Sequence, residues 1–357
     1  MNNNDDDDDD KMIIEDIDSE KEDLFEDNAN YEIITYGADY TLSVFFDKMR
    51  KDEIIVPGFQ RKYVWSRKQA SRLIESFLLG LPVPGIFLSK EKDGTLLVVD
   101  GQQRLKTIQA YINGKLPITE EDFFLNNVKA EWEGKFYKDL ESADKRKLDD
   151  SVLRATIIQQ VNPKDNTSVY HIFERLNTGG TTLQSQEIRN CVYHGAFNDL
   201  LHELNKEKIW RTMYNSQTPS KRMKDEELIL RFFAIYYRYD DYKKPMNEFL
   251  SQFMADNRRI GSDKKVEFTN LFIKTINEVN KKLGIVAFRP KRNLNMAAFD
   301  SIMYVFAKYS ESLVDNIKDK LIVLFNDVAY IKAITQGTTD EETIASRIKI
   351  ATRYLVK

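Results

Sequence analysis

A short polar segment, Asp100-Gly101-Gln102-Gln103-Arg104, stands between an apolar run typical of a strand (residues 95–99) and a helical pattern (residues 105–112). Glycine permits a tight turn there, and the N–H groups at a helix start attract anions. Arg104 could hold a phosphate with two donors, and Asp100 could bind hydrated Mg²⁺. The two glutamines could bind a base, a ribose or an attacking water. The spacing predicts an anion site, and the alternative is that Asp100 only caps the helix.

Two further segments could contribute to such a site. In residues 59–65 (FQRKYVW), Gln60 and Arg61 follow a Pro-Gly turn, a position where side chains often act on ligands, whereas Tyr63 and Trp65 are expected in the core. In residues 173–183 (FERLNTGGTTL), a glycine pair is flanked by polar side chains: Arg175, Asn177 and Thr178. This segment matches neither a P-loop nor a dinucleotide fingerprint, and a helix end with a glycine stop is the alternative.

The elements that must position these segments are mixed in residues 29–200. Ser66 and Gln69 have the spacing of a capping box, and Gly80 and Pro82 predict the end of that helix. Strands are predicted over residues 85–89, 95–99 and 155–161, and a helix is predicted to begin at Asn166 or Thr167.

Residues 201–357 are almost wholly helical in pattern. Residues 228–237 (LILRFFAIYY) are apolar around most of the helix and predict a buried central helix. Further helices are predicted over residues 268–283, 297–309, 313–334 and 341–357. We therefore expect an α+β fold: an acidic disordered tail (1–28), a mixed α/β domain (29–200) and an all-α helical domain (201–357).

Charge is divided unevenly along the chain. Residues 1–28 hold 14 of the 57 acidic and two of the 53 basic side chains, so they carry −12 and the remaining residues carry +8. The tail could simply solvate the protein, or it could mimic nucleic acid and cover the protein's own basic surface. The basic body is compatible with a nucleic-acid partner.

Several classes of site are excluded by composition. With Cys191 as the single cysteine, an internal disulfide and a cysteine-based zinc site are ruled out. His171, His194 and His202 do not stand in a zinc-protease or His-Asn-His nuclease pattern, so we do not expect cleavage by that route. The chain has no apolar run near the ~20 residues of a membrane span and no signal-peptide start, so we expect a cytoplasmic protein without membrane contact.

The three segments together resemble a known family. Their order and spacing, extended by Ser185-Gln186-Glu187-Ile188-Arg189-Asn190 and by residues 222–227, are similar to the N-terminal domain of GmrSD-type restriction enzymes. That resemblance implies a ParB/sulfiredoxin-like fold, found also in phosphorothioate-sensing phage-defence proteins. It further implies nucleotide binding and, in some members, nucleoside triphosphate hydrolysis linked to the sensing of modified DNA.

Residue by residue, the resemblance implies a reaction centre of Asp100, Gln102, Gln103 and Arg104. It implies a nucleotide-binding set of Gln60, Arg61, Gly101, Arg175, Asn177 and Thr178. The expected cofactors are Mg²⁺, held by Asp100, and a nucleoside triphosphate, which could be GTP, ATP or CTP. For DNA we expect Lys62, Arg67, Lys68, Arg222 and Lys224, each of which could instead be an ordinary solvated charge.

Three hypotheses follow from these expectations. The first is a phage-defence protein that hydrolyses nucleoside triphosphates and acts on DNA, with the nuclease supplied by a separate partner. The second is a DNA-binding module that a nucleotide switches without turnover. The third is a metal-dependent nuclease built on Asp100 and Glu187. The sequence leaves a homo-oligomer open in each case.

Overall fold

The computed structural model describes residues 33–56, 63–91, 93–117, 119–160, 168–176 and 184–357. The predicted tail over residues 1–28 lies outside them. The chain divides between Val169 and Tyr170 into two compact units. We call residues 30–169 the sheet unit and residues 170–357 the helical unit. The division falls about thirty residues before the domain boundary expected at residue 200.

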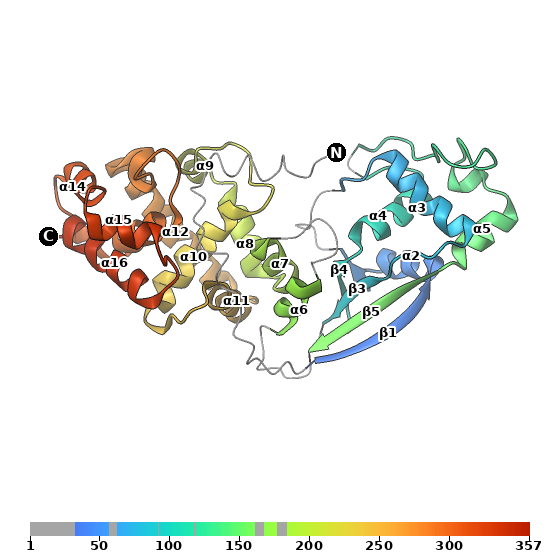
Figure 1. The fold of residues 1–357 in the computed structure, drawn as a ribbon, viewed down its shortest axis with the longest axis horizontal. Helices are drawn as coiled ribbons and strands as arrows, with labels where there is room; N and C mark the ends of the chain where they lie inside the picture. The colour runs from blue at the N-terminus through green and yellow to red at the C-terminus, as the bar shows by residue number, and fades with distance from the viewer. Residues whose placement is uncertain (1–32, 57–62, 92, 118, 161–167, 177–183) are drawn as a thin grey trace. The chain divides into compact units, whose positions relative to one another are not determined.

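The sheet unit contains a mixed five-stranded sheet in the order β1-β5-β3-β4-β2. The edge strand β1 (Ile33–Thr41) and its neighbour β5 (Val152–Gln160) form a long antiparallel ribbon (Figure 1). Strand β3 (Ile86–Lys90) runs parallel to β5 and antiparallel to β4 (Leu96–Asp100), and β2 (Ile54–Ile55) runs parallel to β4. This sheet confirms the expected mixed fold, although β1 was not among the predicted strands.

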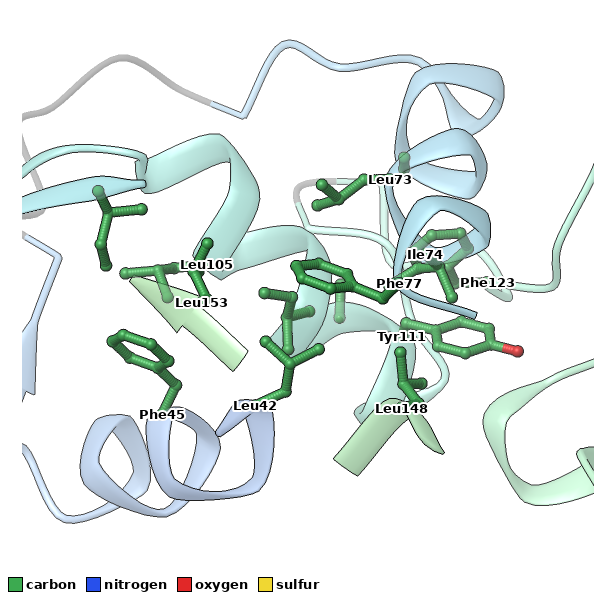
Figure 2. Close-up of a cluster of buried hydrophobic side chains, with 14 of the residues drawn as sticks. Leu42, Phe45, Leu73, Ile74, Phe77, Leu105, Tyr111, Phe123, Leu148 and Leu153 are labelled. Carbon is green, nitrogen blue, oxygen red and sulfur yellow. The ribbon is translucent and has the colours of Figure 1, made fainter. Parts of the chain in front are cut away.

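The described residues of the sheet unit also form four α-helices: α2 (Leu42–Arg50), α3 (Arg67–Leu79), α4 (Gln102–Asn113) and α5 (Ser142–Asp149). Alternate residues of β5, such as Leu153, Ala155 and Ile157, face one common core. Figure 2 shows Leu153 within this cluster together with side chains of all four helices, and Phe45 and Tyr111 are fully buried there. The core fixes α4 against the sheet and thereby fixes where α4 begins.

Local signals in the sequence determine several boundaries of the sheet unit. The capping box is present, because Ser66 accepts from Gln69 N–H and the Gln69 side chain accepts from Ser66 N–H. Gly80 then ends α3 in the left-handed conformation, as expected. Helix α4 begins at Gln102, three residues earlier than the apolar pattern indicated, because residues 102–104 form its polar first turn.

The helical unit is built from α7 (Ser185–Val192), α8 (Ala196–Asn205), α9 (Lys208–Tyr214), α10 (Lys224–Arg238), α11 (Met246–Asn257), α12 (Ser262–Lys282), α13 (Met296–Tyr309), α14 (Ile317–Leu324), α15 (Val328–Thr335) and α16 (Glu341–Leu355), and α6 (Ser168–Leu176) crosses into it. The single helix predicted over residues 313–334 is wrong. It is divided into α14 and α15 because the Asp327 side chain accepts from Tyr330 N–H and starts a new helix. No helix in the described part of the chain is long and apolar enough to span a membrane.

Helix α10 is the buried centre of this unit, as predicted. Its Phe233 packs edge-on against Phe268 of α12, with ring centroids 4.8 Å apart. A buried ionic triad also joins three helices: Asp300 of α13 accepts from Arg231 of α10 at 2.7 Å and from Arg347 of α16 at 2.8 Å. All three side chains are almost fully excluded from solvent, so this triad links α10, α13 and α16.

Candidate functional site

The turn between β4 and α4 is shaped by one glycine packed against β3. Gly101 follows Asp100 with a φ of 98° and a ψ of 8°. A Cβ atom on Gly101 would lie 2.2 Å from Ile86 Cγ2, far inside contact distance. Glycine is therefore needed for the left-handed backbone and for the close approach of β3. We call residues 100–104, with Pro84 and Ile86, the β4–α4 corner.

Arg104 folds back over this turn. Its Nη2 lies 2.7 Å from Asp100 Oδ2, and its Nη1 donates to the Pro84 carbonyl oxygen at 2.7 Å. The Arg104 side chain is 14% exposed, whereas that of Asp100 is 61% exposed. The guanidinium is thus held by the protein, and most of the aspartate carboxylate faces solvent.

The two glutamines of the segment have different surroundings. The side-chain oxygen of Gln103 accepts from the Val64 N–H at 3.1 Å, which ties α4 to the end of the first segment. Tyr63 adds a second link, because its hydroxyl lies 2.8 Å from Thr107 Oγ1. Gln102 Oε1 is buried and has no hydrogen-bond partner among the residues that the structure describes. A buried acceptor in that state leaves a hydrogen bond unmade, which costs free energy unless a donor is supplied.

The first turn of α4 adds a candidate that the sequence analysis missed. No side chain caps the helix at Gly101, so its start retains the positive end of the helix dipole. Lys106 follows Gln102 by one helical turn and is half-buried, and desolvation lowers its pKa below the usual lysine value. Residues four apart lie on the same face of a helix, so the spacing between Gln102 and Lys106 could have identified Lys106 as a candidate from the sequence.

The remaining nucleotide-binding candidates fall mainly outside the described residues. Gln60, Arg61 and the DNA candidate Lys62 lie in residues 57–62, and Asn177 and Thr178 lie in residues 177–183. Arg175 belongs to α6, but nothing is described of its side chain. Their roles stay predictions.

The DNA candidates differ in how accessible they are. Lys68 is exposed and Lys224 is half-buried. Arg67 is held by Glu121 at 3.2 Å and lies over the ring of Phe124. Arg222 is only 5% exposed and lies 3.2 Å from Glu187, inside the helical unit. A DNA surface therefore suits Lys68 better than Arg222.

Helix α7 is built around buried polar side chains, and two of them have partners on α10. Arg189 Nη2 is 2.6 Å from Glu227, and Asn190 Nδ2 donates to Glu226 at 3.0 Å. Glu187, considered above as a metal ligand beside Asp100, accepts from Gln184 N–H at 2.7 Å and pairs with Arg222. The sequence shows that residues 186–190 and 222–227 each contain both acidic and basic side chains, but it does not show which of them pair. These contacts explain why the helical unit begins before residue 200.

Among the ionisable groups of the helical unit, His171 and Asp225 have pKa values that are shifted toward the neutral range or beyond it. Burial opposes the protonation of His171, but the hydrogen bonds and charges of Glu174 and Glu248 outweigh it and raise the pKa to about 9. Burial raises the pKa of Asp225 to about 6, despite Arg211 at 2.9 Å. His171 is therefore a cation at neutral pH. Its ion pairs with Glu174 and Glu248 indicate that it stabilises the fold of the helical unit.

The described residues hold no group of three or more His, Cys, Asp or Glu side chains arranged for a metal ion. Asp100 offers one largely exposed carboxylate at the β4–α4 corner. Mg²⁺ often takes one or two protein carboxylates and completes its shell with phosphate oxygens and water. The corner fits a magnesium ion that arrives with a phosphate ligand.

Comparison with known families supports the resemblance seen in the sequence. Residues 42–194 match the family model described as the GmrSD restriction endonuclease, N-terminal domain. The match runs from α2 past the end of α7, so it includes the β4–α4 corner. A search of curated proteins finds no match. Residues 42–194 of this chain therefore belong to the family of GmrSD restriction endonuclease N-terminal domains.

Proposed function

We propose that this protein binds a nucleoside triphosphate with Mg²⁺ at the β4–α4 corner and serves a restriction-type defence against foreign DNA. The observation that carries the proposal is the corner itself. A strand end, a left-handed glycine and an uncapped helix start bring Asp100 and Gln102 together inside a domain of the GmrSD family. Such a turn suits phosphate because the helix dipole and backbone N–H groups favour negative charge.

The proposal assigns a role to three side chains: Asp100, Gln102 and Lys106. The Asp100 carboxylate would share a magnesium ion with the phosphates, since a carboxylate alone would repel them. The buried Oε1 of Gln102 would accept a hydrogen bond from a base, a ribose hydroxyl or a water. Lys106 would add positive charge one turn along the same helix face. Bound Mg²⁺ would neutralise phosphate charge and, if turnover occurs, the charge that develops during phosphoryl transfer.

DNA is the second partner in the proposal. The chain beyond residue 28 carries a net charge of +8, and Lys68 is exposed on α3. Phosphate contacts of this kind produce affinity that falls steeply with salt. A separate protein would then supply any DNA cleavage.

A nucleotide-switched binding module is the alternative that one observation favours. The corner offers the single carboxylate of Asp100, and no larger cluster of metal-binding side chains occurs in the described ranges. Binding requires no second carboxylate, whereas a carboxylate-based nuclease usually uses more than one. Under this alternative the nucleotide changes DNA affinity but is not consumed.

Calorimetry with all four nucleoside triphosphates and Mg²⁺ tests the proposal, and phosphate release with and without DNA separates turnover from switching. We expect one nucleotide to bind, and we expect Asp100→Ala and Gln102→Ala to weaken it. Lys115→Ala is a matched control, because it removes a 2.6 Å ion pair with Asp122 beyond the other end of α4. The proposal fails if the wild-type chain binds none of the four, and the site is misplaced if both corner variants bind like the control.

A further inference from the structure

Arg104 has two protein partners on different parts of the fold. Its Nη2 meets Asp100 Oδ2 at the end of β4, and its Nη1 meets the carbonyl oxygen of Pro84, just before β3. The planar guanidinium suits this arrangement because its donors point in fixed directions from separate nitrogens. One side chain therefore ties the end of β4 to the chain that enters β3.

The guanidinium is also confined by the glycine turn below it. The Arg104 Nη2 atom lies 3.4 Å from the place that a Cβ atom of Gly101 would occupy, so it rests directly over the turn. The guanidinium uses two of its five N–H donors in these bonds, but the side chain is only 14% exposed, so turning it outward onto a phosphate would break its contact with Asp100 or Pro84. Asp100 would at the same time lose the contact that fixes its orientation.

We infer that Arg104 is a positioning residue that holds the Asp100 carboxylate toward the ligand and does not itself contact the phosphates. This inference rests on the proposed nucleotide site, and it replaces the direct phosphate contact expected from the sequence. Asp100 Oδ2 is held by Arg104, whereas Oδ1 has no hydrogen bond within the described residues and remains for the metal that accompanies the phosphates. Groups that orient a metal ligand in this way strengthen binding without touching the ligand.

A double-mutant cycle tests this role, with nucleotide–Mg²⁺ affinity as the readout. Loss of an orienting partner typically costs about tenfold to a hundredfold in metal affinity, so Arg104→Ala and Asp100→Ala should each weaken binding by about that factor. Because Arg104 acts through Asp100, the double variant should bind no more weakly than Asp100→Ala alone. Losses that multiply in the double variant would show that Arg104 affects binding by a route other than Asp100 and would overturn the inference.

Arg104→Lys provides a second, independent comparison. Lysine binds phosphate well as a point charge, but it has one nitrogen and cannot reproduce two donors on separate nitrogens. A positioning role therefore predicts that Arg104→Lys binds as weakly as Arg104→Ala, whereas wild-type affinity in Arg104→Lys would overturn it.

Hydrogen exchange of the full chain keeps the inference testable without a nucleotide. Arg104→Lys should speed exchange in peptides covering residues 84–86 and 100–105, and the control Lys115→Ala should not. If the wild-type chain binds no nucleotide, the proposed function fails, and the exchange result still decides what Arg104 does. Unchanged exchange in Arg104→Lys would show that Arg104 does not hold the corner.

Discussion

Replacing Gly101 with alanine is the sharpest test of how the β4–α4 corner is built. Gly101 has a φ of 98°, and an added Cβ would lie 2.2 Å from Ile86 Cγ2 and 2.7 Å from Ile86 Cβ. An unfavourable backbone conformation of this kind costs about 1–3 kcal/mol in a non-glycine residue. Overpacking of a buried contact costs roughly 1–3 kcal/mol more. Gly101→Ala should therefore lower the free energy of unfolding of the sheet unit by about 2–6 kcal/mol.

Gly114 offers a matched control at the other end of the same helix. Its φ is 77°, and a Cβ there would meet nothing within 4 Å, so Gly114→Ala should show only the backbone cost. The two variants should differ by roughly 1–3 kcal/mol, which is the contribution of the contact with Ile86. Urea denaturation of the full chain gives the free energies, and hydrogen exchange shows whether the change lies in the sheet unit.

Ile86→Ala then tests the assigned cause. Truncation removes Ile86 Cγ2, the atom nearest to the added methyl group, so Gly101→Ala should cost less in that background than in the wild type. Equal costs for Gly101→Ala and Gly114→Ala would refute the packing argument. The need for glycine would then be a matter of backbone conformation alone.

Three further predictions concern other parts of the chain. The pKa of His171 rises from 6.5 to about 9 on folding, so its stabilising effect should be complete below pH 6.5 and be lost as the pH rises through 9. His171→Gln should remove this slope from thermal unfolding. Asp300→Ala should destabilise the helical unit by about 3–5 kcal/mol in urea denaturation, because it removes the carboxylate that two buried arginines share. Asp315→Ala, at an exposed ion pair, should cost at most about 1 kcal/mol. If the acidic tail covers a basic surface, deletion of residues 1–28 should tighten DNA binding at low salt in a fluorescence titration, and unchanged affinity would leave the tail a solvating role.

The sequence predicted those features of the fold whose causes are local. Ser66 and Gln69 are three residues apart, and Gly80 directly follows the helix it ends, so neighbouring residues contain the whole signal. The buried helix α10 was predicted because its apolar residues cover most of its circumference. The division of residues 313–334 was missed although its signal is also local, because the apolar period continues past Asp327 and hides the cap that this side chain forms with Tyr330 N–H.

Long-range contacts of the candidate site were beyond such reasoning. Arg104 and Pro84 are twenty residues apart, and Arg222 and Glu187 are thirty-five residues apart. The sequence around an arginine beside a glycine turn looks the same whether the arginine binds a phosphate or a backbone carbonyl oxygen. Burial decides between these possibilities, and the periodicity of a single segment does not show which polar residue is buried.

The β4–α4 corner divides its polar residues into those that build it and those that remain open to a ligand. Gly101 meets a packing constraint, Gln103 accepts from the backbone of Val64, and Arg104 holds Asp100 and Pro84. Loss of any of these three would weaken ligand binding by disturbing the corner, so weaker binding alone could not identify a contact. Asp100 and Gln102 are different, because a largely exposed carboxylate and a buried acceptor without a described partner have more to gain from a ligand than from the fold. Asp100→Ala also removes one partner of Arg104, so it should lower stability as well as affinity. Gln102→Ala should change affinity with little change in stability, and that separation is what distinguishes a ligand contact from a structural support.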